Sequence, residues 1–388
     1  MATYILGISC FYHDSAAAIV RDGHIVAAAQ EERFSRSKHD PSFPTSAINY
    51  CLEEAFIEAG DLTAVVFYDD PLLTFDRIFK CFLEISPRGF DLWTKAARSF
   101  LPKNFFFKAF VTDFLKVDIP VISTRHHLSH AASAFFPSPF DAAAILTVDG
   151  VGEWATTSIS LGQENTITTL KQIHFPHSLG LLYSAFTYYC GFRVNSGEYK
   201  LMGLAPYGEA RYADTIRDNL IDLKEDGSFQ LNLDFFGYLD SDTITNPNCD
   251  QLFGGSAREP ESRITRREID LAASIQIVTE QAMLGLVRHA HSITDKQNLC
   301  LAGGVALNCV ANGQVLREGS FQKIWIQPAA GDAGGALGAA LAASHMRFGI
   351  PRPLPNGDED SQQGSYLGPA YSDQEIAAFL DRYEFPHE

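Results

Sequence analysis

The sequence is short of basic residues. It holds 30 Lys and Arg against 47 Asp and Glu, which gives a formal net charge of −17 at pH 7. A partner that binds through its phosphate backbone needs a basic protein surface to displace counterions, so we expect no nucleic-acid partner. The net charge does not exclude small anionic ligands, because helix N-termini and turns of backbone N–H groups bind them whatever the net charge.

Long apolar runs and cysteine pairs are absent as well. No run approaches the roughly 18 to 20 apolar residues of a membrane-spanning helix, and the first residues lack the basic and apolar regions of a signal peptide. The seven cysteines are scattered and include no C-x-x-C pair, which is typical of reduced core thiols. We expect a soluble cytoplasmic protein without membrane contact.

The chain does hold enough apolar sequence for a large core. Hydrophobic residues make up 46% and charged residues 20% of its 388 positions, which is ordinary for a globular protein. This length fits two domain-sized units or one large unit with two lobes.

Three histidines, His126, His127 and His130, fall within five residues of a segment that reads as a helix. Four residues apart, His126 and His130 share one helix face, and two imidazoles at this spacing can hold one transition metal. The apolar run 142–148 reads as a buried strand that ends at Asp149, whose carboxylate would complete a site for iron, zinc or manganese. The alternative is that the histidines pack or cap the helix, and His127 has no assigned role.

The chain passes twice through one pattern: a buried strand, a turn, a hairpin of two further strands and a helix. The strands are expected at 4–9, 15–21 and 24–29 in the first round and at 143–148, 154–161 and 166–174 in the second, with helices at 45–59, which Thr45 would cap, and 179–190. This duplication resembles the two-lobed α/β architecture of actin-like proteins, the fold of sugar kinases and heat-shock ATPases with ribonuclease-H-like halves. In that fold each hairpin turn faces a cleft and touches phosphates.

We place the first lobe at about 1–140 and the second at about 141–349. Residues 71–116, rich in Phe and Leu at helical spacing, predict a helical insertion that covers one face of a sheet. Residues 263–291 should form one long core helix. After Gly349 the proline- and acid-rich segment 350–388 reads as an interdomain linker that leads, through a short helix capped by Ser372, toward a further domain.

Glycines mark two turns between a strand and a helix. At Gly303 and Gly304, backbone N–H groups can approach a phosphate or ribose closely, although such a turn also serves tight packing. At the second turn Asp332 heads a helix rich in Ala and Gly, either as its N-cap or as another metal carboxylate. The segment 197–208 surrounds Lys200 with glycines and a proline, which indicates a loop at the site.

Six motifs of this chain occur together in one known family. They are GIS at 7–9, YHDSAA at 12–17, EERFSR at 31–36, the histidine pair at 126 and 130, SGEYKLMGLAPYG at 196–208 and the stretch 303–312. With them the chain resembles the O-carbamoyltransferases of secondary metabolism, which act on nodulation factors, cephamycins and aminoglycosides. The resemblance runs from the first strand to about residue 385.

The resemblance also implies site residues. A divalent metal, most often iron, would be held by His126, His130, Asp149 and Asp332. The phosphates and ribose of a nucleotide would be held by Gly150, Gly152, Gly303, Gly304 and Asn308. Lys200 would contact a phosphate or the carbamoyl oxygen, and the acceptor would be met by His13, Asp14 and Lys38.

Members of this family join an actin-like domain to a C-terminal YrdC-like domain. The YrdC-like domain makes carbamoyl-adenylate from carbamoyl phosphate and ATP, and the actin-like domain transfers the carbamoyl group to the hydroxyl of a small molecule. The characteristic FGPRALG motif of the C-terminal half does not occur in the 388 residues. We therefore expect the transferase half alone, served by a YrdC-like domain in cis or in trans, and a homodimer is a further expectation.

The chemistry leaves the general base open between His13 and His39, whose intrinsic pKa suits proton transfer. Of the two, His39 is the weaker candidate, because a histidine in a charged loop is usually solvated. Backbone N–H groups at Gly150 and Gly304 would supply fixed dipoles that stabilise the oxyanion developing during carbamoyl transfer. One rival is an actin-fold ATPase or kinase that holds magnesium on Asp14 or Asp149; the paired histidines argue against it, because magnesium prefers oxygen ligands. The other rival is a non-catalytic partner protein that binds a metal and a nucleotide.

Overall fold

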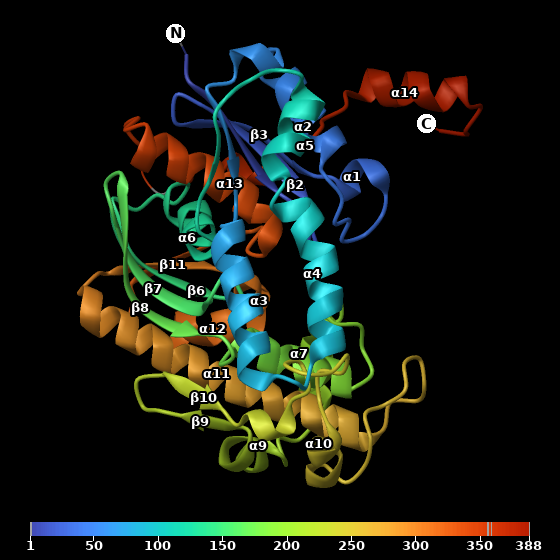
Figure 1. The fold of residues 1–388 in the computed structure, drawn as a ribbon. Coiled ribbons are helices and arrows are strands. Elements are labelled where there is room, and N and C mark those ends of the chain that lie inside the picture. Colours follow the sequence, from blue (N-terminus) through green and yellow to red (C-terminus); the bar gives the residue numbers. More distant parts are fainter. Residues whose placement is uncertain (1, 355–356, 358, 388) are drawn as a thin grey trace.

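Two five-stranded sheets form the frame of the molecule (Figure 1). This computed structural model describes residues 2–354, 357 and 359–387. The first sheet contains β1 (Tyr4–Ser9), β2 (Ala16–Arg21), β3 (His24–Gln30), β4 (Ala64–Phe67) and β5 (Val121–Ser123). The second contains β6 (Ala142–Val148), β7 (Ala155–Gln163), β8 (Thr166–His174), β11 (Asn298–Ala302) and β12 (Lys323–Ile326), and the short strands β9 (Ile221–Leu223) and β10 (Phe229–Leu231) pair separately.

Both sheets have the same topology. Their strand orders are β3-β2-β1-β4-β5 and β8-β7-β6-β11-β12. In each sheet the first three strands form an antiparallel meander, β1-β2-β3 and β6-β7-β8, while the two later strands are parallel to the central strand. This duplicated arrangement is the two-lobed, ribonuclease-H-like topology of the actin-like fold, so the predicted fold class is confirmed.

Local sequence explains the frame. The central strands β1 and β6 are almost continuously apolar because both of their faces are covered. The first hairpin turns at Asp22 and Gly23, whose φ angles are 48° and 85°. Two successive positive φ angles match the right-handed twist of the flanking strands, and Asp-Gly adopts them readily.

Helices surround this frame. Outside the insertion they are α1 (Glu32–Ser35), α2 (Thr45–Glu54), α6 (His126–Phe135), α7 (Leu179–Tyr189), α8 (Glu198–Leu204), α9 (Ala213–Asn219), α10 (Pro247–Leu252), α11 (Arg266–Thr294), α12 (Cys309–Glu318), α13 (Asp332–Ala342) and α14 (Asp373–Arg382). Short 3-10 turns lie at Ala59–Asp61, Ala205–Tyr207, Leu233–Phe235, Gly304–Leu307 and Gln363–Ser365, and a π turn lies at Ala343–Arg347.

Two local predictions need correction. The helix expected at 45–59 ends at Glu54, because Phe56 adopts a left-handed φ of 54°. Thr45 is its first residue and not its cap; the carboxylate of Glu31 accepts the N–H groups of its first turn. The segment 197–208 is not a loop but the helix α8 followed by a 3-10 turn.

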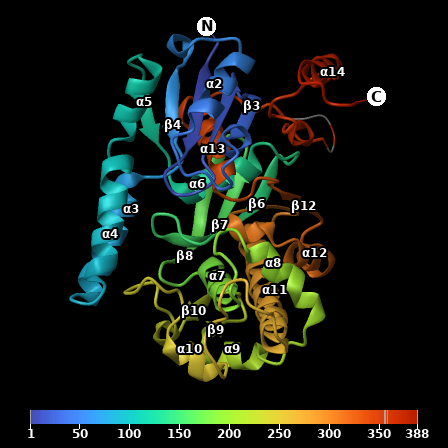
Figure 2. The same ribbon diagram turned by 90° about the vertical axis from the view of Figure 1, so that its right-hand side faces the viewer.

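The insertion predicted at 71–116 is helical throughout most of its length. It forms α3 (Pro71–Ile85), α4 (Phe90–Asn104) and α5 (Phe107–Leu115). Only α5 covers the first sheet, where the ring of Phe107 stacks on Phe67 at 4.2 Å. The helices α3 and α4 instead extend side by side along the molecule (Figures 1 and 2), and Lys95 of α4 pairs with Asp242 of the second half of the chain.

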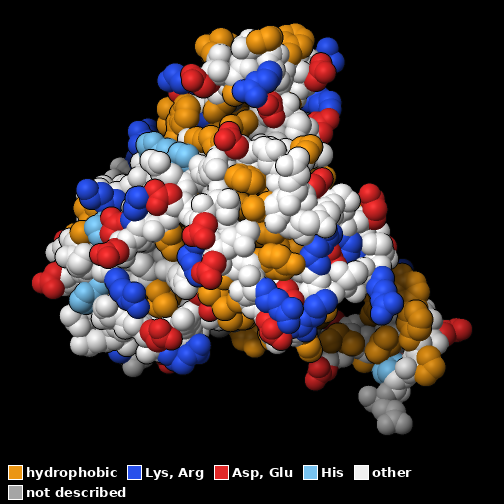
Figure 3. Space-filling model, turned by 90° about the horizontal axis from the view of Figure 1, so that it is seen from below, with side chains coloured by type: hydrophobic (Ala, Val, Ile, Leu, Met, Phe, Trp, Pro, Cys, Tyr) orange, Lys and Arg blue, Asp and Glu red, His pale blue; other side chains and the backbone are white. Residues whose placement is uncertain are grey.

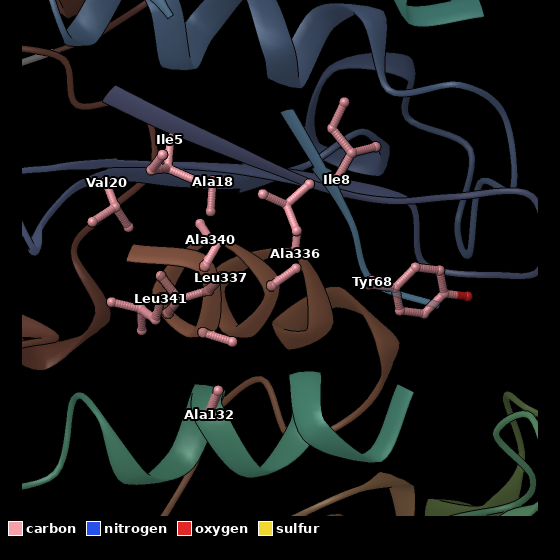
Figure 4. Packing of buried hydrophobic residues seen from close by; sticks show 14 of the residues in the cluster. Ile5, Ile8, Ala18, Val20, Tyr68, Ala132, Ala336, Leu337, Ala340 and Leu341 are labelled. Atoms are coloured by element: carbon pink, nitrogen blue, oxygen red, sulfur yellow. The ribbon is translucent and has the colours of Figure 1, made fainter. Parts of the chain in front are cut away.

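Helix α13 joins the two lobes. Although it lies within the range predicted for the second lobe, it packs between the first sheet and α6 (Figure 4). Small side chains make this possible: a Cβ on Gly7 of β1 would lie 1.9 Å from the carbonyl oxygen of Ala336, and a Cβ on Gly338 would lie 1.7 Å from that of Ser129. The predicted tight packing of this Ala- and Gly-rich helix is confirmed, and it fixes α6 against the first lobe.

Parts of the segment 350–388, which is predicted to be an interdomain linker, contact the first lobe. The backbone N–H of Ala28 donates to the carbonyl of Leu367. The side chain of Arg352 is 9% exposed and donates hydrogen bonds of 2.6–2.9 Å to the carbonyl oxygens of Phe135, Phe136, Ser138 and Phe140. Beyond it, Ser372 caps α14 as predicted, and that helix projects from the body (Figures 1 and 2).

The surface agrees with the composition. On the face seen from below, Lys and Arg side chains are interspersed with Asp and Glu (Figure 3). Across the described part of the chain, no helix combines the length and the apolar character that crossing a membrane requires.

We predict that Arg352→Met destabilises the fold. The substitution leaves the four carbonyl groups at the end of α6 without their buried donor, so the free energy of unfolding should fall by about 2 to 4 kcal/mol. Urea unfolding of the purified protein measures this change. The exposed Arg347 provides the control, because Arg347→Met should change the stability by less than about 0.5 kcal/mol; equal effects of both variants would contradict the role of Arg352.

Candidate functional site

A cavity of about 280 Å³ lies between the two lobes. Turns and helix ends of both lobes supply its lining, as expected for a duplicated fold whose hairpin turns face each other. The lining residues are Tyr12, His13, Asp14, Lys38, His39, Asp149, Gly150, Val151, Gly180, Leu181, Tyr183, Ser184, Asn195, Ser196, Glu198, Tyr199, Met202, Gly304, Val305, Leu307, Asn308, Gly331 and Asp332.

The four residues predicted to hold a metal meet beside this cavity, and two of them, Asp149 and Asp332, belong to its lining. Each of His126, His130, Asp149 and Asp332 offers a ligand atom, all within 4.8 Å of one another, and all four residues are buried. His126 Nε2 lies 3.1 Å from both His130 Nε2 and Asp149 Oδ2, and 3.6 Å from Asp332 Oδ1. Three elements converge here: α6 presents both imidazoles on one face, β6 ends immediately before Asp149, and α13 begins at Asp332.

The cluster is electrostatically coupled. Burial alone would lower the pKa of His126, but the hydrogen bond to Asp149 and the negative charges of Asp332 and Asp149 raise it to about 10. Burial would raise the pKa of Asp149, yet the hydrogen bond from His126 and the imidazole of His130 at 3.7 Å hold that pKa well below its usual range. Two imidazole nitrogens and two carboxylates form the mixed N/O donor set that suits iron, zinc or manganese, so the residues fit the expected metal.

The glycine turn after β11 supports this cluster directly. Gly304 lines the cavity, and its backbone N–H donates to Asp149 Oδ1 at 2.8 Å, so it orients a predicted metal ligand. Gly303 has a φ of 88°, and a Cβ there would lie 2.3 Å from the carbonyl oxygen of Val148. Gly303 therefore permits close packing of the turn on β6, behind the cavity.

Other predicted nucleotide-binding residues differ in their placement. Gly150 lines the cavity, and no atom lies within 4 Å of the position that its Cβ would take. Gly152 is absent from the lining and packs on the α6 histidines, where a Cβ would lie 3.0 Å from the Cβ of His126. Asn308 lines the cavity, but its amide caps α12 and forms a reciprocal pair with Gln276.

The turn between β1 and β2 and the loop after α1 place a carboxylate between two histidines. Asp14 Oδ2 lies 2.8 Å from His13 Nδ1, and Asp14 Oδ1 lies 2.8 Å from His39 Nδ1. Burial would lower the pKa of His13, but the charges of Asp332 and Asp14 raise it to about 9. His39 Nε2 is buried and has no hydrogen-bond partner among the described residues.

Lys38 and Lys200 have different positions. The Lys38 ammonium lies 5.5 Å from the ring centroid of Tyr199, so it spans the mouth of the cavity from the first lobe to α8. Lys200 is exposed and is not part of the lining. Because the segment is a helix and not a loop, successive side chains point in different directions, and Tyr199 and Met202 face the cavity instead.

Several lining residues carry no prediction from the sequence. Tyr12 and Glu198 belong to motifs that the sequence shares with its family, and Glu198 accepts hydrogen bonds from Ser184 Oγ and the backbone N–H of Asn195. The only available signal was membership of a motif, since neither residue type nor spacing separates these residues from ordinary core or surface positions.

The duplicated sheets define the molecule as an actin-like protein. The buried cluster of two histidines and two carboxylates beside the interlobe cavity is its candidate metal centre. Residues 4–341 match the family described as carbamoyltransferase N-terminus, and the chain belongs to this family. The resemblance stated from the motifs is confirmed.

Two curated relatives align in sequence with most of this chain. The uncharacterized protein sll1178 of Synechocystis is 56% identical over 386 residues, which cover 97% of this chain and 62% of the relative. The nodulation protein NolNO of Sinorhizobium fredii is 36% identical over 335 residues, which cover 86% of this chain and 47% of that protein. The chain thus spans about half to two thirds of the length of these relatives.

Among solved structures, component A of (R)-2-hydroxyglutaryl-CoA dehydratase from Acidaminococcus fermentans aligns with a TM-score of 0.47 and 16% identity, covering 89% of this chain and 99% of that one.

We predict that a methyl group destabilises the fold at one glycine of the site and not at another. Gly303→Ala should lower the free energy of unfolding by more than about 2 kcal/mol, because the backbone is left-handed and the Cβ meets a carbonyl oxygen. Gly150→Ala should change it by less than about 1 kcal/mol, because the new Cβ enters open space. Denaturant unfolding measures both; a destabilised Gly150→Ala protein would show that Gly150 is a packing residue.

Proposed function

We propose that this chain transfers a carbamoyl group from carbamoyl-adenylate to the hydroxyl group of a small-molecule acceptor. The observation that carries the proposal is the cluster of His126, His130, Asp149 and Asp332 at an interlobe cavity, in a chain of the carbamoyltransferase N-terminus family. We assign only the transfer step to this chain. Activation of carbamoyl phosphate by ATP would belong to a YrdC-like domain acting in cis or in trans.

The metal centre would be held by the four clustered side chains. A divalent metal bound there, with iron ahead of zinc and manganese, would supply Lewis acidity toward a carbonyl or phosphoryl oxygen. The protein's own contribution is to keep two imidazoles and two carboxylates converging in a buried place. Gly150, with open space around it, allows a donor molecule to approach the backbone closely.

The acceptor hydroxyl would be deprotonated by His39. Asp14 accepts the hydrogen bond of His39 Nδ1, which fixes the tautomer in which Nε2 carries the lone pair. That Nε2 has no partner within the described chain, and His39 lines the cavity. Glu32 holds the backbone of this residue by accepting its N–H at 2.7 Å. His39 therefore replaces His13, whose two nitrogens face Asp14 and Asp332, as the favoured base.

In the proposed transfer, each bond that forms is matched by one that breaks. The acceptor oxygen forms a bond to the carbamoyl carbon, its proton passes to His39 Nε2, and the bond from that carbon to the phosphate oxygen breaks to release AMP. Lys38 and Tyr199 contact each other across the mouth of the cavity, where they would contact the acceptor and limit the access of water.

An actin-fold kinase or ATPase is the second candidate function. The same cavity would hold a nucleotide in that case, but two of the four clustered ligands are imidazoles, and magnesium prefers oxygen ligands. A non-catalytic metal- and nucleotide-binding role is the third.

We predict that the chain forms carbamoylated product from preformed carbamoyl-adenylate and a hydroxyl acceptor, with release of AMP. Given carbamoyl phosphate and ATP alone, it should form neither carbamoyl-adenylate nor product, because activation is assigned to the YrdC-like domain. Mass spectrometry of both mixtures, with sugar and aminoglycoside acceptors, provides the test. A phosphorylated acceptor with release of ADP would instead support a kinase, and product from the second mixture would place activation in this chain.

We predict that His39→Ala lowers the rate of transfer by about 10²- to 10⁴-fold, the range for a positioned general base. The metal held by the cluster of four ligands should stay in place, because His39 is not part of that cluster and instead converges with Asp14 and Glu32. The matched control is His174→Ala on β8, an exposed histidine outside the cavity. Transfer at the wild-type rate by His39→Ala, with the donor saturating, would reject His39 as the base.

A further inference from the structure

Glu153 is a buried carboxylate in the turn between β6 and β7, and neither the motifs nor the proposed reaction assigns it a role. Its side chain is 5% exposed. One oxygen, Oε1, accepts two backbone hydrogen bonds: from the N–H of His126 at 2.7 Å and from the N–H of Asp70 at 3.1 Å. A single oxygen atom thus joins three segments that are far apart in the sequence.

The two donors stand at the starts of helices. His126 is the first residue of α6, and Arg125 at its N-cap contributes no side-chain hydrogen bond, so Glu153 supplies the acceptor that this helix end needs. Asp70 is the N-cap of α3, where its own carboxylate accepts the N–H groups of Leu72 and Leu73. Glu153 itself lies four residues after Asp149. The start of the metal-binding helix is therefore fixed relative to a ligand from the other lobe.

The turn around Glu153 is held from both sides. Gly152 packs so closely that a Cβ would lie 3.0 Å from His126 Cβ. On the other side the indole N–H of Trp154 donates to Asp76 of α3 at 3.2 Å, and Lys80 lies over the same indole ring at 5.9 Å. The helical insertion, which the sequence left without a function, thus supports the turn that carries Glu153.

We propose that Glu153 is a positioning residue of the metal centre: it sets the separation between the imidazoles on α6 and the carboxylate of Asp149. This inference rests on the proposed function, because it takes the four-residue cluster as a metal site. Groups that orient metal ligands typically change metal affinity by 10- to 100-fold when they are removed. A displaced α6 start would move His126 relative to Asp149, which face each other at 3.1 Å.

The chain contains a matched control for a purely structural carboxylate. Glu31 is 4% exposed, and it too accepts two backbone N–H groups at the start of a helix, those of Ser46 and Ala47 of α2. Neither Glu31 nor α2 contributes to the cavity or to the cluster. Loss of either carboxylate removes the same kind of helix cap, but only one of the two helices carries metal ligands.

The test is a titration of the full chain, stripped of metal by a chelator, with Co²⁺, whose visible absorption reports its coordination. Glu153→Ala should bind Co²⁺ about 10- to 100-fold more weakly than the wild type, with an altered spectrum. Glu153→Gln keeps an Oε1 acceptor for both N–H groups and should restore affinity and spectrum. Glu31→Ala should lower the melting temperature but leave both unchanged.

Two results would overturn the inference. One is a folded Glu153→Ala protein with the wild-type affinity and spectrum, and the other is an equal loss of affinity in Glu31→Ala. If Glu153→Ala fails to fold, Glu153→Asp replaces it, because a carboxylate one methylene shorter cannot keep both contacts and should shift the spectrum. A His126→Ala chain that binds Co²⁺ as tightly as the wild type would show that the cluster is not a metal centre, and both the metal centre of the proposed function and this inference would fall. Loss of binding in His126→Ala together with unchanged binding in Glu153→Ala would overturn this inference alone.

Discussion

Mutual charge compensation between two imidazoles and two carboxylates is the interaction on which the centre of this structure depends. A buried ion without a partner costs several kcal/mol, so His126, His130, Asp149 and Asp332 are compatible with burial only when they lie together. Their meeting requires three elements to converge: α6, the end of β6 and the start of α13. The close packing of α13 between α6 and the first sheet satisfies that requirement (Figure 4).

This constraint also explains the supporting contacts. The N–H of Gly304 orients Asp149, the carboxylate of Glu153 holds the start of α6, and Arg352 binds the carbonyl groups at the end of the same helix. These residues are separated by up to about half of the chain, yet all act on the position of one helix or its ligand partner. The insertion and the segment after Gly349 therefore contribute to the site through contacts with α6 and the β6–β7 turn.

Most of the frame could be predicted because its signals are local. Apolar runs bounded by turns such as Asp22-Gly23 located the strands, and the repeated order of elements gave the fold. The sequence could not show that α13 returns to the first sheet or that Arg352 makes a buried contact, because long-range packing leaves no local pattern. Helical spacing and a strand end predicted the meeting of His126, His130 and Asp149, whereas the place of Asp332 among them came from the family resemblance. The exposure of Lys200 could not be predicted, because the expected loop is a helix.

The central claim is that His126, His130, Asp149 and Asp332 bind one transition metal beside the cavity. Anomalous X-ray diffraction from crystals of the protein, measured on either side of the iron, zinc and manganese absorption edges, tests it most directly. The account predicts one strong peak per chain, about 2.0 to 2.3 Å from a ligand atom of each of the four residues. A peak held by other residues, or metal-replete crystals without a peak between the two imidazoles, would contradict it.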